Sequence, residues 1–254
     1  HKALDMAGSA LGIFASYWLL KNGGNSFQYK ELFAVSAIPA LLGLLMFFFI
    51  KEKKRERAAV KRESFWKNIS RLDGQLKLYL AAAFVFTLGN SSNTFLLLRA
   101  RNVGFGDADI ILLYFVFNLT ASLLSIPLGR LSDRIGRKSL LVAGYLVFSA
   151  VYLGFAMGRS RASIAVIFVL YGVYSAMISG VERAFIAEIS PAELKGTMLG
   201  LHSTVVGIAL LPASMIAGIL WSWLGAPAPF LFGSVMSLAA AIALQVFMRN
   251  AKQQ

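Results

Sequence analysis

The chain of 254 residues contains no cysteine and only two histidines, His1 and His202. Disulfide bonds and thiolate metal sites are therefore excluded, and a histidine-rich metal centre is not expected. The patterns G-x-x-x-x-G-K-[S/T], H-E-x-x-H and G-x-S-x-G are also missing from the sequence. An ATP-driven pump and an intramembrane hydrolase consequently have no support, and neither enzyme activity nor a cofactor is expected.

Charged residues are scarce, at 15% of the chain, whereas 57% is hydrophobic and the mean hydropathy is +0.67. A soluble domain is about 25% charged. The apolar residues gather in blocks of about twenty, the length that crosses a bilayer as a helix, and the alternating segments of a transmembrane barrel are absent. These features predict an all-α polytopic membrane protein whose surroundings are the lipid bilayer.

Acidic residues are few, with 12 Asp and Glu against 25 Lys and Arg, which gives a net charge of +13. In a soluble protein this imbalance would suggest nucleic acid as a partner. Here the bases lie mainly in short connections between apolar runs, where they set membrane orientation and contact anionic lipid head groups. No nucleic-acid partner is expected.

The apolar runs predict eight transmembrane helices. The polar segment 51–76 holds nine Lys or Arg and is therefore expected to lie on the cytoplasmic side. Because successive spans cross the membrane in opposite directions, both ends of this chain are then also expected in the cytoplasm. The membrane is predicted to be the inner membrane of the cell. Of the 25 bases, 18 lie on the predicted inner side and six on the outer side, with Arg99, Arg101, Arg159 and Arg161 among the exceptions. The predicted spans are about 4–20, 31–50, 77–98, 110–128, 139–158, 163–187, 197–221 and 229–248.

A charged segment, residues 129–138, connects two of these spans and reads G-R-L-S-D-R-I-G-R-K. Its bases place it on the cytoplasmic side, and its two glycines favour a tight turn. An acid at a fixed position among the bases is not needed for topology. Asp133 therefore points to a specific electrostatic role.

This pattern resembles the signature loop of the major facilitator superfamily of secondary transporters, in a bacterial branch. The resemblance implies two bundles of six helices joined by a long cytoplasmic loop, a parallel-repeat architecture. On that plan residues 1–50 are helices five and six, 51–76 is the central loop and 77–254 is the six-helix C-terminal bundle. The four preceding helices, the remainder of the N-terminal bundle, are expected to lie upstream of His1.

The signature loop is expected to gate the transporter as an ionic latch. Asp133 is predicted to cap the helix that begins near Gly196, and Arg137 to pair with Glu188. The alternative is that the segment needs only bases and a turn. The residues assigned to gating are Gly129, Asp133, Arg134, Gly136, Arg137, Lys138, Glu188 and Arg183.

Glu182 and Arg183 lie within the predicted span 163–187, where ionisable side chains are costly unless they pair or face water. Neighbouring helix positions point about 100° apart, so the two side chains face different surroundings. Glu182 is the candidate for contact with the substrate or with a coupling proton. Arg183 is assigned to the cytoplasmic charge network with Asp133 and Glu188.

Asn90 and Asn93 share a helix face in the span 77–98, inside the run G-N-S-S-N that is expected to loosen the helix. They are candidates for lining a cavity, and interhelical hydrogen bonding is the alternative. Further candidates for the substrate or proton site are Asn118, Tyr171 and His202.

These features predict a secondary active transporter, a permease that works as an antiporter or symporter. It would move a small-molecule substrate by alternating access around a cavity at mid-membrane, driven by a proton or solute gradient. The alternative is a membrane scaffold or regulatory protein without transport activity.

Overall fold

The computed structural model describes residues 2–22, 29–46 and 74–247, and every regular element in them is a helix. Most of the predicted central loop 51–76 lies outside these residues, as does the end of the predicted span 31–50. The helices are α1 (Lys2–Asn22), α2 (Tyr29–Met46), α4 (Gly74–Gly89), α5 (Thr94–Asn102), α6 (Asp107–Ile135), α7 (Arg137–Met157), α8 (Arg161–Ile178), α9 (Val181–Ile189), α10 (Lys195–Leu224) and α11 (Ala228–Phe247), with a 3₁₀ turn η2 (Ala192–Leu194).

Six stretches of the described chain are long and apolar enough to cross a membrane: Gly74–Asn102, Asp107–Ile135, Arg137–Met157, Arg161–Ile189, Lys195–Leu224 and Ala228–Val246. They correspond to the last six predicted spans and confirm an all-α polytopic membrane protein. The first two predicted spans appear as α1, with its apolar stretch Ala7–Leu19, and α2. The total of eight spans stays a prediction.

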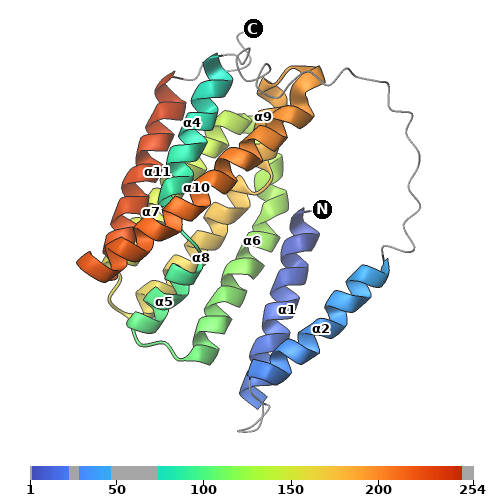
Figure 1. Ribbon diagram of the computed structural model, residues 1–254, viewed down its shortest axis with the longest axis vertical. Coiled ribbons are helices and arrows are strands. Elements are labelled where there is room, and N and C mark those ends of the chain that lie inside the picture. Colours follow the sequence, from blue (N-terminus) through green and yellow to red (C-terminus); the bar gives the residue numbers. More distant parts are fainter. Residues whose placement is uncertain (1, 23–28, 47–73, 248–254) are drawn as a thin grey trace.

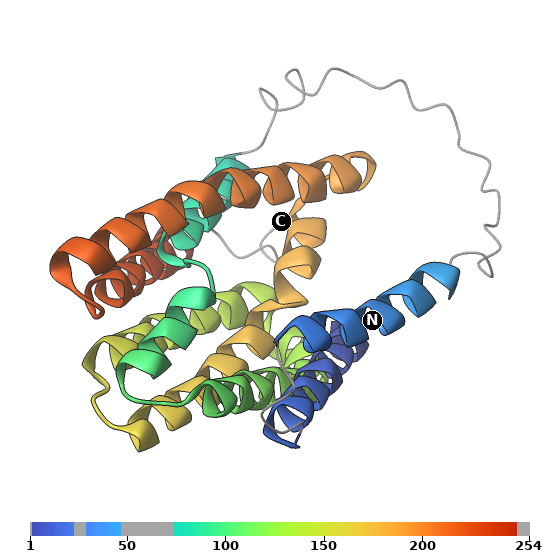
Figure 2. The ribbon, with the colours of Figure 1, turned by 60° about the horizontal axis from the view of Figure 1, so that its bottom comes forward.

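Figure 1 shows the spans running side by side, with α1 lying along α6 and α2 beyond it. Figure 2 shows α10 and α11 grouped with α4, while α6 and α8 form a neighbouring layer. The helix α7 joins the layers because it packs against both α11 and α8. Antiparallel connections place α9 and the end of α6 at one end of the bundle, and α5 and the start of α6 at the other.

Two of the six spans are interrupted. The predicted span 77–98 corresponds to the observed span Gly74–Asn102, which breaks at residues 90–93, inside the run where loosening was expected. Asparagine and serine compete for backbone hydrogen bonds, and here Ser92 Oγ accepts a bond from the Thr94 N–H at 3.3 Å. The predicted helix 163–187 also divides, at Ser179–Gly180, into α8 and α9.

The charged segment 129–138 is not the predicted turn. The helix α6 continues through Ile135 and α7 begins at Arg137, so Gly129 lies inside a helix. The direction changes at Gly136 alone, whose φ of 92° lies in the region that favours glycine. A single glycine is enough because the Gly136 N–H still bonds to the Ser132 carbonyl, at 3.0 Å.

Close backbone contact fixes α4 against α11. Gly89 and Gly233 face each other, and a Cβ placed on Gly89 would lie 3.0 Å from the Gly233 Cα and 2.7 Å from the Met236 Cβ. Beside them, the rings of Tyr152 and Phe230 are fully buried with their centroids 5.5 Å apart. Without side chains at the crossing, the two backbones approach as small residues allow in membrane bundles.

Arg99 and Arg161, two of the arginines on the predicted outer side, donate hydrogen bonds to backbone carbonyls. Arg99 is 6% exposed, and its guanidinium donates to the carbonyls of Phe155, Ala156 and Gly158 at 2.9–3.3 Å. These carbonyls lie at the C-terminal end of α7, where the helix leaves acceptors unused and favours a cation. Arg161 donates to the Gly104 carbonyl. Local helix-end chemistry therefore explains the presence of these cations.

Candidate functional site

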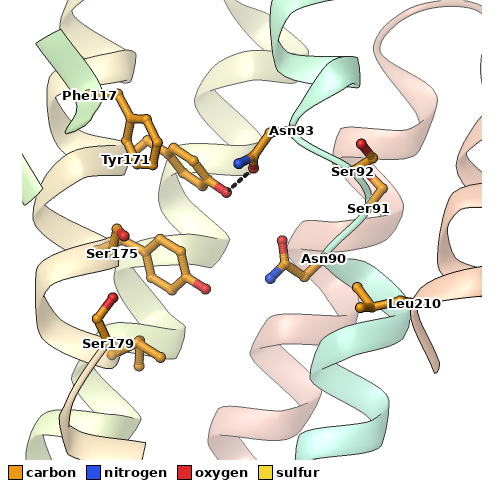
Figure 3. Close-up of a pocket in the computed structure, with 11 residues that line it drawn as sticks. Asn90, Ser91, Ser92, Asn93, Phe117, Tyr171, Ser175, Ser179 and Leu210 are labelled. Atoms are coloured by element: carbon orange, nitrogen blue, oxygen red, sulfur yellow. Dashed lines mark hydrogen bonds between the residues drawn. The ribbon is translucent and has the colours of Figure 1, made fainter. Parts of the chain in front are cut away.

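A cavity of about 330 Å³ lies beside the break between α4 and α5 (Figure 3). One side is formed by the interrupted segment, and the other by α8 with Phe117 of α6. We call this cavity the polar pocket. Its lining residues are Asn90, Ser91, Ser92, Asn93, Phe117, Tyr171, Tyr174, Ser175, Ile178, Ser179 and Leu210.

A hydrogen bond joins the two sides of the polar pocket. The Tyr171 hydroxyl donates to Asn93 Oδ1 at 2.9 Å, and Figure 3 shows this bond between facing side chains. Asn93 reaches this position because it directly precedes the first residue of α5, Thr94. Tyr171 is held from behind by the Phe117 ring, whose centroid is 4.9 Å away. Three of the predicted candidates, Asn90, Asn93 and Tyr171, are thus brought together.

A larger cavity, of about 430 Å³, lies between α6 and α8 but is lined by apolar side chains and by Asp109. Val166 in its wall is 59% exposed, and none of the predicted site residues borders it. A few polar groups among apolar ones are what orient a small molecule. The polar pocket has that mixture and is therefore the candidate site.

A second group of polar side chains, most of them buried, adjoins the polar pocket through Tyr174, and we call it the tyrosine–glutamate cluster. The Tyr145 hydroxyl donates to Glu182 Oε1 at 3.4 Å. The ring of Tyr79 stacks on His202, with centroids 5.7 Å apart and 21° between the planes. Glu182 interacts electrostatically with both Tyr79 and Tyr174, and Tyr174 also lines the polar pocket.

Two atoms in this cluster lack a partner. His202 Nε2 and the Tyr79 hydroxyl are buried and make no hydrogen bond to any residue that the structure describes. A buried polar group without a partner costs about 1–3 kcal/mol, so such atoms call for a ligand, water or proton. The other titratable group facing His202 is Arg183, through an electrostatic interaction. Helices α4, α7, α9 and α10 together build the cluster.

The charged end of the bundle is centred on Arg137. Its guanidinium contacts Glu188 Oε2 at 3.2 Å, which is the predicted pair, and donates to the Ala184 carbonyl at 3.1 Å. It also lies 3.6 Å from Asp133 Oδ1. Arg137 thereby connects the junction of α6 and α7 to α9.

Other sequence expectations for this end were wrong. Asp133 does not cap α10: its side chain is 67% exposed, and its one ion pair among the described residues is with Arg137. Arg183 is exposed and makes no ion pair with Asp133 or Glu188 within the described chain. Arg134 is likewise exposed, whereas Lys138 is half-buried.

Asn118 does not reach the polar pocket. Its amide donates to the Tyr114 carbonyl of the preceding turn at 2.8 Å, and its side chain is buried within the bundle. Ser175 and Ser179, in contrast, line the pocket but were missed by the sequence reasoning. The signal was present, because both lie at helical spacing from Tyr171, on the face it shares with Tyr174. Tyr145 was missed because nothing in the sequence places it beside Glu182.

The geometry defines a class of protein, a polytopic helical membrane protein whose interrupted spans surround a polar pocket. Residues 78–254 match the family model described as Major Facilitator Superfamily. The chain belongs to this superfamily, which is a family of transporters and not of enzymes.

Similar proteins come from an archaeon and a bacterium. An uncharacterized MFS-type transporter of Methanocaldococcus jannaschii is 36% identical over 96% of this chain and 62% of its own length. A second such transporter of that organism is 27% identical over 56% of this chain and 37% of its own. The quinolone resistance protein NorA of Staphylococcus aureus is 25% identical over 60% of this chain and 39% of its own. The chain thus spans less than two thirds of the length of these relatives.

Proposed function

We propose that this chain forms helices five to twelve of a secondary active transporter, which moves a small solute through the membrane by alternating access. The observation that carries the proposal is the polar pocket, where the Asn93–Tyr171 hydrogen bond joins two spans beside a helix break. Polar side chains within spans are costly unless they pair or face a water-filled cavity, and such cavities mark the paths of substrates. The superfamily match supports the same function and disfavours a scaffold without transport.

The remaining parts of the proposal follow the same plan. Four further helices complete the N-terminal bundle, in keeping with the 62% of the archaeal relative that this chain spans. Both ends of the chain lie in the cytoplasm, and the membrane is the inner membrane. A proton or solute gradient supplies the energy, as antiport or symport.

Cysteine labelling tests alternating access without a known substrate, because it reports which side of the membrane a residue faces. This chain contributes no cysteine, and any cysteine in the further helices is first replaced by serine. We expect Asn90→Cys, in the polar pocket, to react with a membrane-impermeant maleimide in both right-side-out and inverted vesicles. Arg159→Cys, exposed in the connection between α7 and α8, is the control and should react in one orientation only. Labelling of Asn90→Cys from a single side would contradict the proposal.

The second prediction concerns the latch. We propose that the contacts of Arg137 with Glu188 and Ala184 stabilise one of the two access states. Arg137→Met should then change the ratio of inside to outside labelling at Asn90→Cys by about fivefold, the effect of about 1 kcal/mol on an equilibrium. Asp133→Asn, which removes one exposed partner, should have a smaller effect in the same direction.

Arg134→Met is the matched control for the latch, because it removes a neighbouring positive charge that makes no ion pair with the described residues. It should leave the labelling ratio unchanged. An equal change in Arg134→Met and Arg137→Met would show that net charge, and not the contact with α9, controls the ratio.

The third prediction concerns Glu182, which we propose as the site of a coupling proton. Its carboxylate is bonded to Tyr145 and lies near the unpartnered Tyr79 hydroxyl, so a change of protonation there rearranges four helices. The labelling ratio at Asn90→Cys should depend on pH in the wild-type background and lose that dependence in Glu182→Gln. Glu188→Gln, on the same helix, should keep the pH dependence. Its retention in Glu182→Gln would count against the proton role.

A further inference from the structure

His202 is buried in the bundle with one ring nitrogen unused. The residue is 7% exposed, and its ring stacks on that of Tyr79 with the centroids 5.7 Å apart. Packing alone does not need the nitrogen, because a phenylalanine ring would stack on the tyrosine equally well. Neither His202 Nε2 nor the Tyr79 hydroxyl makes a hydrogen bond to a residue in the described ranges. Two buried polar atoms on stacked rings, each costing about 1–3 kcal/mol when unpaired, therefore call for a chemical role.

Tyr79 connects His202 to Glu182. Its ring contacts the imidazole, and its hydroxyl interacts electrostatically with the Glu182 carboxylate. Glu182 in turn accepts the hydrogen bond from Tyr145 and interacts electrostatically with Tyr174, which lines the polar pocket. The buried polar groups thus form a series that runs from α10 through α4 to α9, and from there to the polar pocket.

This series begins close to the charged end of the bundle. Tyr79 and His202 lie within the first three turns of α4 and α10, and both helices start at the end of the bundle that carries α9 (Figure 1). At a rise of about 1.5 Å per residue, His202 is about 10 Å along the axis from the start of α10. The polar pocket lies farther from this end, at the break after α4.

The charges around His202 suit it to pass a proton on. In the described chain, the titratable and charged groups that face it are Tyr79 from α4 and Arg183 from α9, with Glu182 and Tyr145 beyond Tyr79. The helix α11, which also contacts α10, contains no titratable residue between Ala228 and Phe247. The positive charge of Arg183 disfavours a lasting imidazolium. A proton therefore rests on Glu182 and only passes through His202.

We infer that Tyr79 and His202 carry the coupling proton between Glu182 and the charged end of the bundle. This inference rests on the proton role proposed for Glu182 and adds the route. The Glu182 carboxyl gives its proton to the Tyr79 oxygen, while the Tyr79 hydroxyl gives its own proton to His202 Nε2. The imidazolium then releases one proton to water at the charged end, and the carboxylate remains. A hydroxyl can donate and accept at once, and a neutral imidazole has one accepting nitrogen.

Infrared spectroscopy tests the route at Glu182 itself, in the complete transporter in lipid nanodiscs. The carboxyl band of Glu182 is identified as the band that Glu182→Gln removes, and its change is followed after a jump in pH. We expect His202→Phe, which keeps a stacking ring, to slow this change at least about a hundredfold, the lower limit for proton transfer by a positioned side chain. The final amplitude should equal that of the wild type, because Glu182 still holds the proton.

Further variants separate proton transfer from packing. Tyr79→Phe keeps the ring, removes the hydroxyl and should slow the change to a similar extent. Tyr17→Phe is the matched control, because it removes a hydroxyl on α1 whose partner is Lys21, and it should leave the rate unchanged. His202→Ala should also be slow, and free imidazole should accelerate it by occupying the space that the side chain leaves.

Wild-type rates in both His202→Phe and Tyr79→Phe would overturn the inference. So would a slow His202→Ala protein that imidazole does not accelerate, since its defect would then be structural. Failure of the proton role of Glu182 is recognised separately, because Glu182→Gln then removes no carboxyl band that depends on pH, and the route is rejected together with the role. Failure of alternating access leaves these rates unaffected and appears as labelling of Asn90→Cys from one side only.

Discussion

Replacement of Arg99 by methionine is expected to lower the free energy of unfolding by about 3 kcal/mol, since hydrogen bonds to a charged group contribute about 1.5–3 kcal/mol each. The guanidinium bonds to three carbonyls at the end of α7 and to Asn102 Oδ1 at 2.7 Å. Methionine fills a similar volume but donates to none of them. The three carbonyl oxygens at the end of α7 would remain buried without this partner.

The measurement is denaturant unfolding of the purified protein in mixed micelles. Arg101→Met is the control, because that side chain is 69% exposed and its one described ion pair, with Asp107, has a separation of 3.8 Å. An exposed pair of this kind contributes less than about 1 kcal/mol. Equal stability of Arg99→Met and Arg101→Met would show that the buried bonds do not hold α5 to α7.

Replacement of Gly233 by valine is expected to be as severe, with a loss of about 3 kcal/mol or no folded protein. A Cβ at this position would lie 2.6 Å from the Tyr152 Cδ1 atom and would overlap the Gly89 carbonyl oxygen. Overpacking costs typically about 1–3 kcal/mol and more where backbone must move. Here the obstacle on one side is backbone, so α4 and α11 must separate.

The control is Gly207→Ala in α10, where an added Cβ would meet no atom within 4 Å. Its stability should stay within about 0.5 kcal/mol of the wild type or rise slightly, because alanine restricts the unfolded chain. Thermal unfolding and the yield of monodisperse protein measure both variants. A well-folded Gly233→Val protein would mean that the helices do not cross at Gly89.

Sequence reasoning located the membrane spans because long apolar runs directly reflect the solvent that they face. The resemblance of residues 129–138 to a signature loop led to the Arg137–Glu188 pair, and polar side chains inside apolar runs led to three residues of the polar pocket. It did not predict that residues 129–138 are almost entirely helical. Whether a charged segment continues a helix or turns depends here on one glycine with positive φ.

The tyrosine–glutamate cluster could not be derived in the same way. Tyr145 and Glu182 are 37 positions apart, and Tyr79 and His202 meet across α4 and α10. Such pairs follow from the rotation of each helix about its own axis, which hydropathy alone does not fix. The helix breaks at Ser179–Gly180, and Glu182 in α9 does not line the polar pocket, whereas Ser175 of α8 does.

The contacts that hold the interrupted span Gly74–Asn102 have a consequence for its movement. Its first piece, α4, is in close contact with α11 at Gly89 and Gly233, and its second piece, α5, is held to α7 by the buried guanidinium of Arg99. If α7 and α11 move relative to each other, the backbone torsion angles of residues 90–93 must therefore change. These four residues include Asn90 and Asn93, whose amides line the polar pocket. Bending of the span at this point would therefore also change the shape of the pocket.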